Sequence, residues 1–152
     1  MKPTLIQELE GFLSAKEVDF EILHHEKPIK SRNDALIYFR LEEMAPTLIL
    51  KTENGMFALI ISGVQEKIDF EIIREKLGCS KIGLASKDEV LQSLGMKTGE
   101  VAMVRHGLPS ILDKRIFESK YIFVGAGDAN YTLKINPHDL AKVNEVILQL
   151  FL

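Results

Sequence analysis

The stretch of residues 121–140 constrains the fold of this chain more than any other. It contains an apolar strand, two glycines spaced one apart (Gly125 and Gly127), a second strand, and a helix opened by Asn136 and Pro137. Asparagine followed by proline is a common helix start, because the first helical N–H needs no partner within the helix. Glycine allows a tight turn and lets a ligand approach the backbone closely. The stretch therefore predicts either a plain hairpin or a hairpin whose glycines contact a ligand.

A second hairpin is predicted at residues 47–61, where Asn54-Gly55 separates two apolar runs suited to central strands. Apolar periodicity and capping residues predict the other elements. The expected helices span 4–16 with Thr4 as its cap, 32–40 with Leu36, Ile37 and Phe39 pointing inward, 70–77, and two more after Ser86 and Asn136. The further expected strands are 19–24, 81–85, 101–104, 116–118, 121–124 and 131–135.

These elements favour a single α/β domain over residues 1–152. A chain of this length can bury a core without disulfides or metals. Hairpins join several of the roughly seven strands, and about five helices are interleaved with them. This order favours a mixed sheet covered by helices over a parallel, doubly wound sheet.

Composition predicts a cytoplasmic protein without a membrane segment. Residues 1–10 carry acidic side chains where a signal peptide needs an apolar run, and no later run approaches the ~20 apolar residues of a membrane span. The one cysteine, Cys79, permits no internal disulfide and is expected to be structural. The net charge of −3 argues against broad nucleic-acid binding, but basic residues within 27–40 and 97–120 leave room for a local basic face.

The remaining candidate chemistry lies in two glycine-rich breaks, residues 99–109 and 125–127. The second break joins two strands, whereas phosphate-binding and dinucleotide-binding loops open a helix, so the sequence argues against those classes. The histidines lack metal-ligand spacing, and neither a metal nor another cofactor is expected. If a sheet brings the two breaks together, their backbone groups can line a pocket that stabilises an oxyanion. His106 would lie either at its rim, as a donor or base, or on an exposed loop without a role.

Seven motifs follow one another in a characteristic order. They are the helix capped by Ser31, Ala45-Pro-Thr-Leu-Ile-Leu50, Ile68-Asp-Phe70, Leu84-Ala-Ser-Lys-Asp-Glu89, Thr98-Gly-Glu-Val101, Val124-Gly-Ala-Gly127 and Leu133-Lys-Ile-Asn-Pro-His-Asp-Leu140. Their order resembles the YbaK-type aminoacyl-tRNA editing domains, a family that includes the insertion domain of bacterial prolyl-tRNA synthetases. The resemblance implies an α/β fold around a mixed, barrel-like sheet. It also implies hydrolysis of the ester that joins a wrong amino acid to the 3′ end of a tRNA.

The resemblance also implies roles for individual positions. In the family, a lysine before the Thr/Ser-Leu strand orients the substrate, a Gly-x-x-x-Pro loop shapes the amino-acid pocket, and later glycines contact the ester. The expected substrate-binding set, taken from these positions and the two breaks, is Pro46, Thr47, Gly99, Met103, Gly107, Gly125, Ala126 and Gly127. Pro46 stands where the family has its lysine, and Met103 where it has the loop proline. Lys51 is a candidate replacement cation, but strand alternation points it to the opposite face unless a bulge intervenes.

The sequence is therefore compatible with two main functions. The first is a free-standing deacylase that hydrolyses mischarged tRNA in trans, with His106 and Lys51 as candidate catalytic residues. The second is a catalytically degenerate module that binds tRNA or a synthetase, motivated by Pro46 and Met103; a small-molecule esterase is a third alternative. The expected partners are the 3′ end of a mischarged tRNA and an aminoacyl-tRNA synthetase. The apolar stretch 146–152 would either pack in the core or supply a homodimer contact.

Overall fold

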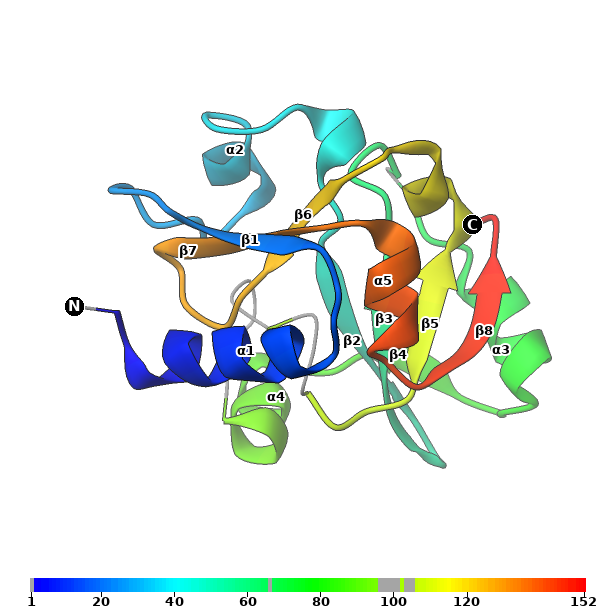
Figure 1. Ribbon diagram of the computed structural model, residues 1–152. Coiled ribbons are helices and arrows are strands. Elements are labelled where there is room, and N and C mark those ends of the chain that lie inside the picture. Colours follow the sequence, from blue (N-terminus) through cyan, green and yellow to red (C-terminus); the bar gives the residue numbers. More distant parts are fainter. Residues whose placement is uncertain (1, 66, 96–101, 103–105) are drawn as a thin grey trace.

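The computed structural model describes residues 2–65, 67–95, 102 and 106–152, and over these ranges the chain forms a mixed α/β fold with two sheets (Figure 1). The elements in chain order are α1 (Thr4–Ala15), β1 (Phe20–His24), α2 (Arg32–Ala35), β2 (Thr47–Thr52), β3 (Gly55–Ile60), α3 (Phe70–Leu77), β4 (Ile82–Leu84), α4 (Lys87–Leu94), β5 (Ser110–Asp113), β6 (Ile122–Gly125), β7 (Tyr131–Ile135), α5 (Pro137–Lys142) and β8 (Val146–Leu150), with 3₁₀ helices at Leu41–Glu43 and Lys114–Glu118. The expected mixed α/β class is confirmed, although the strands divide between two sheets and close no barrel within the described residues.

The larger sheet has the strand order β4-β2-β3-β5-β8. The predicted β2–β3 hairpin is confirmed, with Thr52 opposite Gly55 at the turn, and both of its strands are interior. Strands β3 and β5 pair in parallel, as do β5 and β8. These parallel pairings join segments far apart in the sequence, which is why β5 and β8 were not predicted as strands.

The smaller sheet has the order β1-β7-β6 and is antiparallel throughout. Its β6–β7 pair is the predicted hairpin around the Gly-Ala-Gly break, with Gly125 opposite Thr132. A short seam joins this sheet to the chain entering β2: Met44 bridges Phe123, and the Ala45 N–H donates to the Phe123 carbonyl at 3.0 Å. The two sheets thus meet where β2 begins.

The main core fills the space between the two sheets, α1 and α5. Its fully buried side chains include Leu13 of α1, Ile60 of β3, Leu112 of β5, Leu133 of β7 and Leu140 of α5. In Figure 1, α1 runs below the smaller sheet, whereas α3 lies at the opposite side of the molecule beside β8. A second cluster packs α3 through Ile73 on Leu50 and Leu59, on the face of the larger sheet away from the main core. A third cluster packs α4 through Val90 on Ile49 and Ala58, on the opposite face of these two strands.

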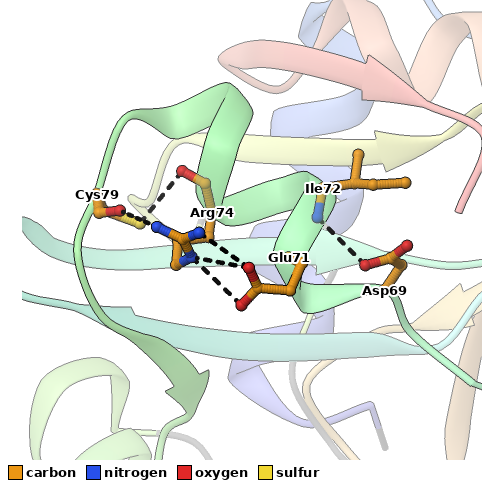
Figure 2. A network of polar contacts seen from close by, with 5 residues as sticks. All are labelled: Asp69, Glu71, Ile72, Arg74 and Cys79. Atoms are coloured by element: carbon orange, nitrogen blue, oxygen red, sulfur yellow. Dashed lines mark hydrogen bonds and ion pairs between the residues drawn. The ribbon is translucent and has the colours of Figure 1, made fainter.

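Cys79 belongs to a polar network at the end of α3, shown in Figure 2. The Asp69 carboxylate caps the helix by accepting the Ile72 N–H at 3.2 Å, and Arg74 pairs with Glu71 at 2.9 Å. The Arg74 guanidinium also donates to the Cys79 carbonyl at 3.5 Å, and the Cys79 thiol donates to the Arg74 carbonyl at 3.8 Å. The buried Cys79 therefore has a structural role, because it bonds the last turns of α3 through its thiol and its carbonyl.

Several local predictions need correction. Pro3, without a side-chain hydrogen bond, precedes α1 in place of a Thr4 cap, and α2 ends at Ala35. Leu36 and Ile37 are consequently exposed, because the chain leaves the helix before they could turn inward. Residues 116–118 lie in a 3₁₀ helix, since the Asp113 carboxylate accepts the Arg115 N–H and bends the chain there. The strand expected at 101–104 falls almost wholly outside the described residues.

The C-terminal stretch forms an edge strand of the larger sheet. Burial alternates along β8, with Ile147 exposed and Leu148 partly buried against the cluster beneath α3. Within the described residues, no helix is long and apolar enough to cross a membrane.

Candidate functional site

A cavity of about 210 Å³ opens beside the seam between the two sheets. Three parts of the chain line it: β2 and the residues before it, the β6–β7 hairpin, and the segment that leads into α2. Pockets for drug-sized ligands measure roughly 300–1,000 Å³, so this one suits a group the size of a single amino acid.

The β2 wall contains Pro46 and Thr47, both predicted to bind substrate. The Pro46 carbonyl accepts the Ile61 N–H at 3.1 Å, which holds this wall to the neighbouring strand. The Thr47 hydroxyl oxygen is buried and has no hydrogen-bond partner among the described residues. Leaving a buried polar group unsatisfied costs about 1–3 kcal/mol, so a ligand that hydrogen-bonds to it would recover this free energy.

The β6–β7 wall contains Gly125 and Ala126 but not Gly127. Gly127 has φ +90°, and a Cβ placed on it would lie 2.8 Å from Leu5 Cδ2 of α1. Only glycine readily adopts that backbone conformation so close to a neighbour. The Gly-Ala-Gly break therefore divides into a part that faces the cavity and a glycine that fits the hairpin onto α1.

The third wall brings two cations, Lys30 and Arg32, to the cavity. The Ile29 N–H donates to the Ala129 carbonyl at 2.7 Å and ties this segment to the β6–β7 hairpin. The Arg32 guanidinium donates to the carbonyl of Gly63, a residue packed too tightly against the chain before β2 to carry a side chain. Arg32 thus lines the same cavity as Pro46.

A buried histidine lies behind the β7 side of the cavity. His25, which follows β1, has its Nδ1 2.8 Å from the Lys27 carbonyl oxygen and its Nε2 3.0 Å from the hydroxyl oxygen of Thr132. Thr132 lines the cavity, as does Asp128 of the hairpin loop. None of His25, Thr132 and Asp128 is among the residues predicted from the sequence to form the site.

His106 and Lys51, the two predicted catalytic candidates, do not line the cavity. His106 is buried, not exposed on a loop, and burial lowers the pKa of its ring. Its Nδ1 accepts the Leu108 N–H at 3.1 Å, so in the neutral ring Nε2 carries the proton and faces Ser110 Oγ at 3.4 Å. A nitrogen that carries a proton cannot act as the base for that serine. Lys51 forms an ion pair with Glu89 of α4 and, as strand alternation requires, lies on the face of β2 opposite to Pro46.

Three further predicted positions do not contribute to the described cavity. Gly107 adopts φ +77° with open space around it and lies outside the lining. Gly99 and Met103 lie outside the described residues. The cavity thus brings together Pro46, Thr47, Gly125 and Ala126 from the predicted set.

The sequence contained partial signals for the residues it missed. Lys30 and Arg32 lie in the basic segment 27–40, which was expected to form a local basic face. Asp128 follows the glycine break directly, and Thr132 is the polar residue in the buried half of the next strand. A hydroxyl in an otherwise apolar buried position signals a specific hydrogen bond. The loop that places His25 against Thr132 gave no such signal.

The family model for the aminoacyl-tRNA editing domain matches residues 27–143, and the chain belongs to that family. No curated protein sequence matches the chain.

Solved structures show the same fold at low sequence identity. A crystal structure of a protein described as hypothetical has a TM-score of 0.84 at 22% identity, covering 94% of this chain and 97% of the other. A crystal structure of a candidate trans-editing enzyme for prolyl-tRNA synthetase has a TM-score of 0.83 at 16% identity, covering 97% and 96%. The structure of a candidate signal transduction protein from Marinobacter aquaeolei has a TM-score of 0.65 at 16% identity, and the match covers 96% of this chain but only 30% of the other.

Proposed function

We propose that this protein is a free-standing deacylase that hydrolyses the ester of a mischarged tRNA in trans. Membership of the editing-domain family supports a role in tRNA editing. The observation that carries the finer proposal concerns Thr47, which lines a cavity of amino-acid size and whose buried hydroxyl has no partner among the described residues. A small group that enters the cavity beside Thr47 can give this hydroxyl the missing partner.

In the proposed reaction, water attacks the carbonyl carbon of the ester. The carbonyl oxygen becomes an oxyanion, the bond to the 3′ oxygen of the terminal ribose breaks, and that oxygen takes up a proton. The products are a free amino acid and a tRNA with a free 3′ end. Donors aimed at the oxyanion lower the barrier, and in this proposal the Thr47 hydroxyl and the main chain at Gly125 and Ala126 supply them.

Arg32 supplies the cation that Pro46 cannot. Both residues line the cavity, and the hydrogen bond to the Gly63 carbonyl holds the guanidinium there. A guanidinium has five N–H donors, so one bond to a carbonyl leaves others for a phosphate or ester oxygen. Lys30 adds a second positive charge at the same wall and suits the phosphate backbone of an RNA end.

The test is release of free amino acid from a panel of mischarged tRNAs by the purified protein. At least one tRNA should be deacylated faster than in buffer, and T47V should slow that reaction about a hundredfold, the usual cost of removing one oxyanion donor. R32A should raise KM and weaken its dependence on salt. K51A is the matched control for lost charge and should behave as wild type, because exposed ion pairs contribute little.

Two outcomes would contradict the proposal. One is the absence of release from every tRNA in the panel while tRNA still binds, which is the behaviour of a non-catalytic binding module. The other is equal activity on free aminoacyl esters that tRNA neither improves nor competes away, which is the behaviour of a small-molecule esterase. A P46K variant separates a weakened enzyme from a pure binder, since only the enzyme would gain activity at unchanged tRNA affinity.

A further inference from the structure

The β7 side of the cavity carries a carboxylate and a hydroxyl that the reaction described above does not use. Asp128 is partly buried, and one of its carboxylate oxygens accepts the Asn130 N–H at 2.9 Å. Its other oxygen has no partner among the described residues. Thr132 lies four residues further on and is 6% exposed. Both side chains line the same cavity, so a ligand there meets a negative charge and a hydroxyl on one wall.

The contacts of His25 fix the direction of the Thr132 hydroxyl. A carbonyl oxygen only accepts, so the His25 Nδ1 that lies 2.8 Å from the Lys27 carbonyl carries a proton. In the neutral ring, Nε2 then has a free lone pair, and the Thr132 hydroxyl must donate its proton to it. The remaining lone pairs of that hydroxyl oxygen are available only as acceptors. Thr132 therefore offers an acceptor and no proton to the cavity.

The histidine ring is held in this orientation from several sides. The Tyr38 ring lies 5.1 Å from it, and the Tyr38 hydroxyl accepts the Lys27 N–H at 3.2 Å. The Asn130 side chain donates to the His25 carbonyl at 3.1 Å, and the Asn130 carbonyl accepts the His25 N–H at 2.9 Å. Such support is what a positioning residue needs in order to keep one hydrogen-bond direction.

A carboxylate beside an obligate acceptor matches a cation with several N–H donors. Lys30 and Arg32 line this cavity from the segment that leads into α2, whereas Asp128 lines it from the β6–β7 hairpin. The walls of the cavity therefore differ in charge. We propose that Asp128 and Thr132 form the subsite for the protonated α-amino group of the substrate's amino acid, with His25 as a positioning residue that keeps Thr132 an acceptor. This assignment rests on the proposed function, because an aminoacyl ester carries such an ammonium group beside its reacting carbonyl.

The test compares the binding of two non-hydrolysable probes to the full chain. The first probe is adenosine whose 3′ oxygen is replaced by an amide to an amino acid, and the second is the same molecule without the α-amino group. Calorimetry gives the ratio of their Kd values. Wild type should prefer the ammonium probe at least tenfold, and D128N should reduce that preference to about threefold or less.

Thr132 and His25 variants separate positioning from mere structure. T132V removes the acceptor and should reduce the preference, whereas H25F keeps the hydroxyl but releases its orientation and should reduce the preference by the same amount or less. The double variant should do no worse than T132V, because His25 acts only through the Thr132 hydroxyl. T132S keeps the hydroxyl and should retain the preference. E26Q removes an exposed carboxylate outside the lining and is the matched charge control for D128N.

The outcomes separate this inference from the proposed function. An equal Kd for the two probes in wild type overturns the subsite, even if the protein deacylates tRNA. A clear preference that D128N and H25F both reduce supports it, even if no tRNA is deacylated. Equal weakening of both probes in H25F and T132V, with the ratio unchanged, would mean a structural role only and would also overturn it. Far-ultraviolet circular dichroism confirms that each variant is folded before binding is measured.

Discussion

Two histidines with the same burial have opposite hydrogen-bond patterns in this protein. His25 and His106 are each 6% exposed. The backbone carbonyl of Lys27 requires a proton on Nδ1 of His25, whereas the backbone N–H of Leu108 requires a lone pair on Nδ1 of His106. In the neutral ring of His25, the lone pair is therefore on Nε2, which faces Thr132 at the cavity. In the neutral ring of His106, the lone pair is on Nδ1, where it already accepts the Leu108 N–H.

The difference shows that burial alone does not identify a functional histidine. The decisive feature is which ring nitrogen the local backbone occupies and where the other nitrogen points. At His106 the ring nitrogens contact Leu108, Ser110 and Asn144, all of which lie outside the cavity lining, so we assign the residue a structural role. At His25 the second nitrogen sets the direction of a hydroxyl in the cavity. The following predictions test this contrast, beginning with the largest expected effect.

Replacement of His106 should cost stability without affecting the site. H106A leaves the Leu108 N–H and the fully buried Ser110 hydroxyl without a partner. At about 1–3 kcal/mol for each unsatisfied group, the free energy of unfolding should fall by about 2–4 kcal/mol. Urea denaturation measures this change. A large loss of kcat in the protein that remains folded would remove the distinction between the two histidines.

The glycines near the two histidines extend the contrast. Gly107 and Gly127 both have positive φ, so alanine at either position should cost about 1–2 kcal/mol in backbone strain. G127A should cost more than G107A, because its methyl group would meet Leu5 Cδ2, whereas the space at Gly107 is open. Thermal denaturation of both variants gives the difference. Adding L5A to G127A should recover the excess, and no recovery would show that the α1 contact is not its cause.

Replacement of His25 should affect activity more than stability. H25F frees the Thr132 hydroxyl to turn its proton into the cavity, where it opposes a bound ammonium group. We expect kcat/KM on a mischarged tRNA to fall about tenfold, which corresponds to about 1.4 kcal/mol. The loss of unfolding free energy should be smaller than in H106A, since Lys27, whose carbonyl loses its partner, is an exposed residue. The reverse ranking of the two variants in stability would contradict this assignment.

The smallest expected effect is a pH dependence of stability from His106. Burial holds the pKa of its ring below the ordinary value of 6.5, so the folded protein resists the proton that the unfolded chain takes up. Stability from this residue is therefore fully present above pH 6.5 and is lost as the pH falls toward the lower folded pKa. Unfolding midpoints between about pH 5 and 8 measure the slope. H106Q should flatten it, and an NMR titration of the ring should show the lowered pKa directly.

The fold was predictable where a few neighbouring residues decide the structure. Asn54-Gly55 fixed the β2–β3 hairpin by its turn preference, and Ser86 with Glu89 formed the expected capping box. The strands β5 and β8 were missed, because their pairing is parallel and depends on partners from distant parts of the chain. The division into two sheets has the same cause, since it depends on the contact of Met44 with Phe123.

The candidate site was predictable only along its two strand walls. Pro46, Thr47, Gly125 and Ala126 came from motif order, and the structure places them around one cavity. Arg32 could not be chosen among the neighbouring cations, because its place depends on a hydrogen bond to Gly63, 31 residues away. The role of His25 depends in the same way on Thr132, 107 residues away. Local patterns carry no information on such pairs.

The seam between the sheets has a consequence for how such a domain can diverge. Because the two walls of the cavity belong to separate hydrogen-bonded ladders that touch at Met44, Ala45 and Phe123, a substitution in one ladder leaves the other intact. Proline at position 46 illustrates this, since the β6–β7 wall facing it keeps its full pairing. Selection can therefore alter one strand wall of the cavity at a time, and the ligand preference of the cavity can change without rebuilding the scaffold.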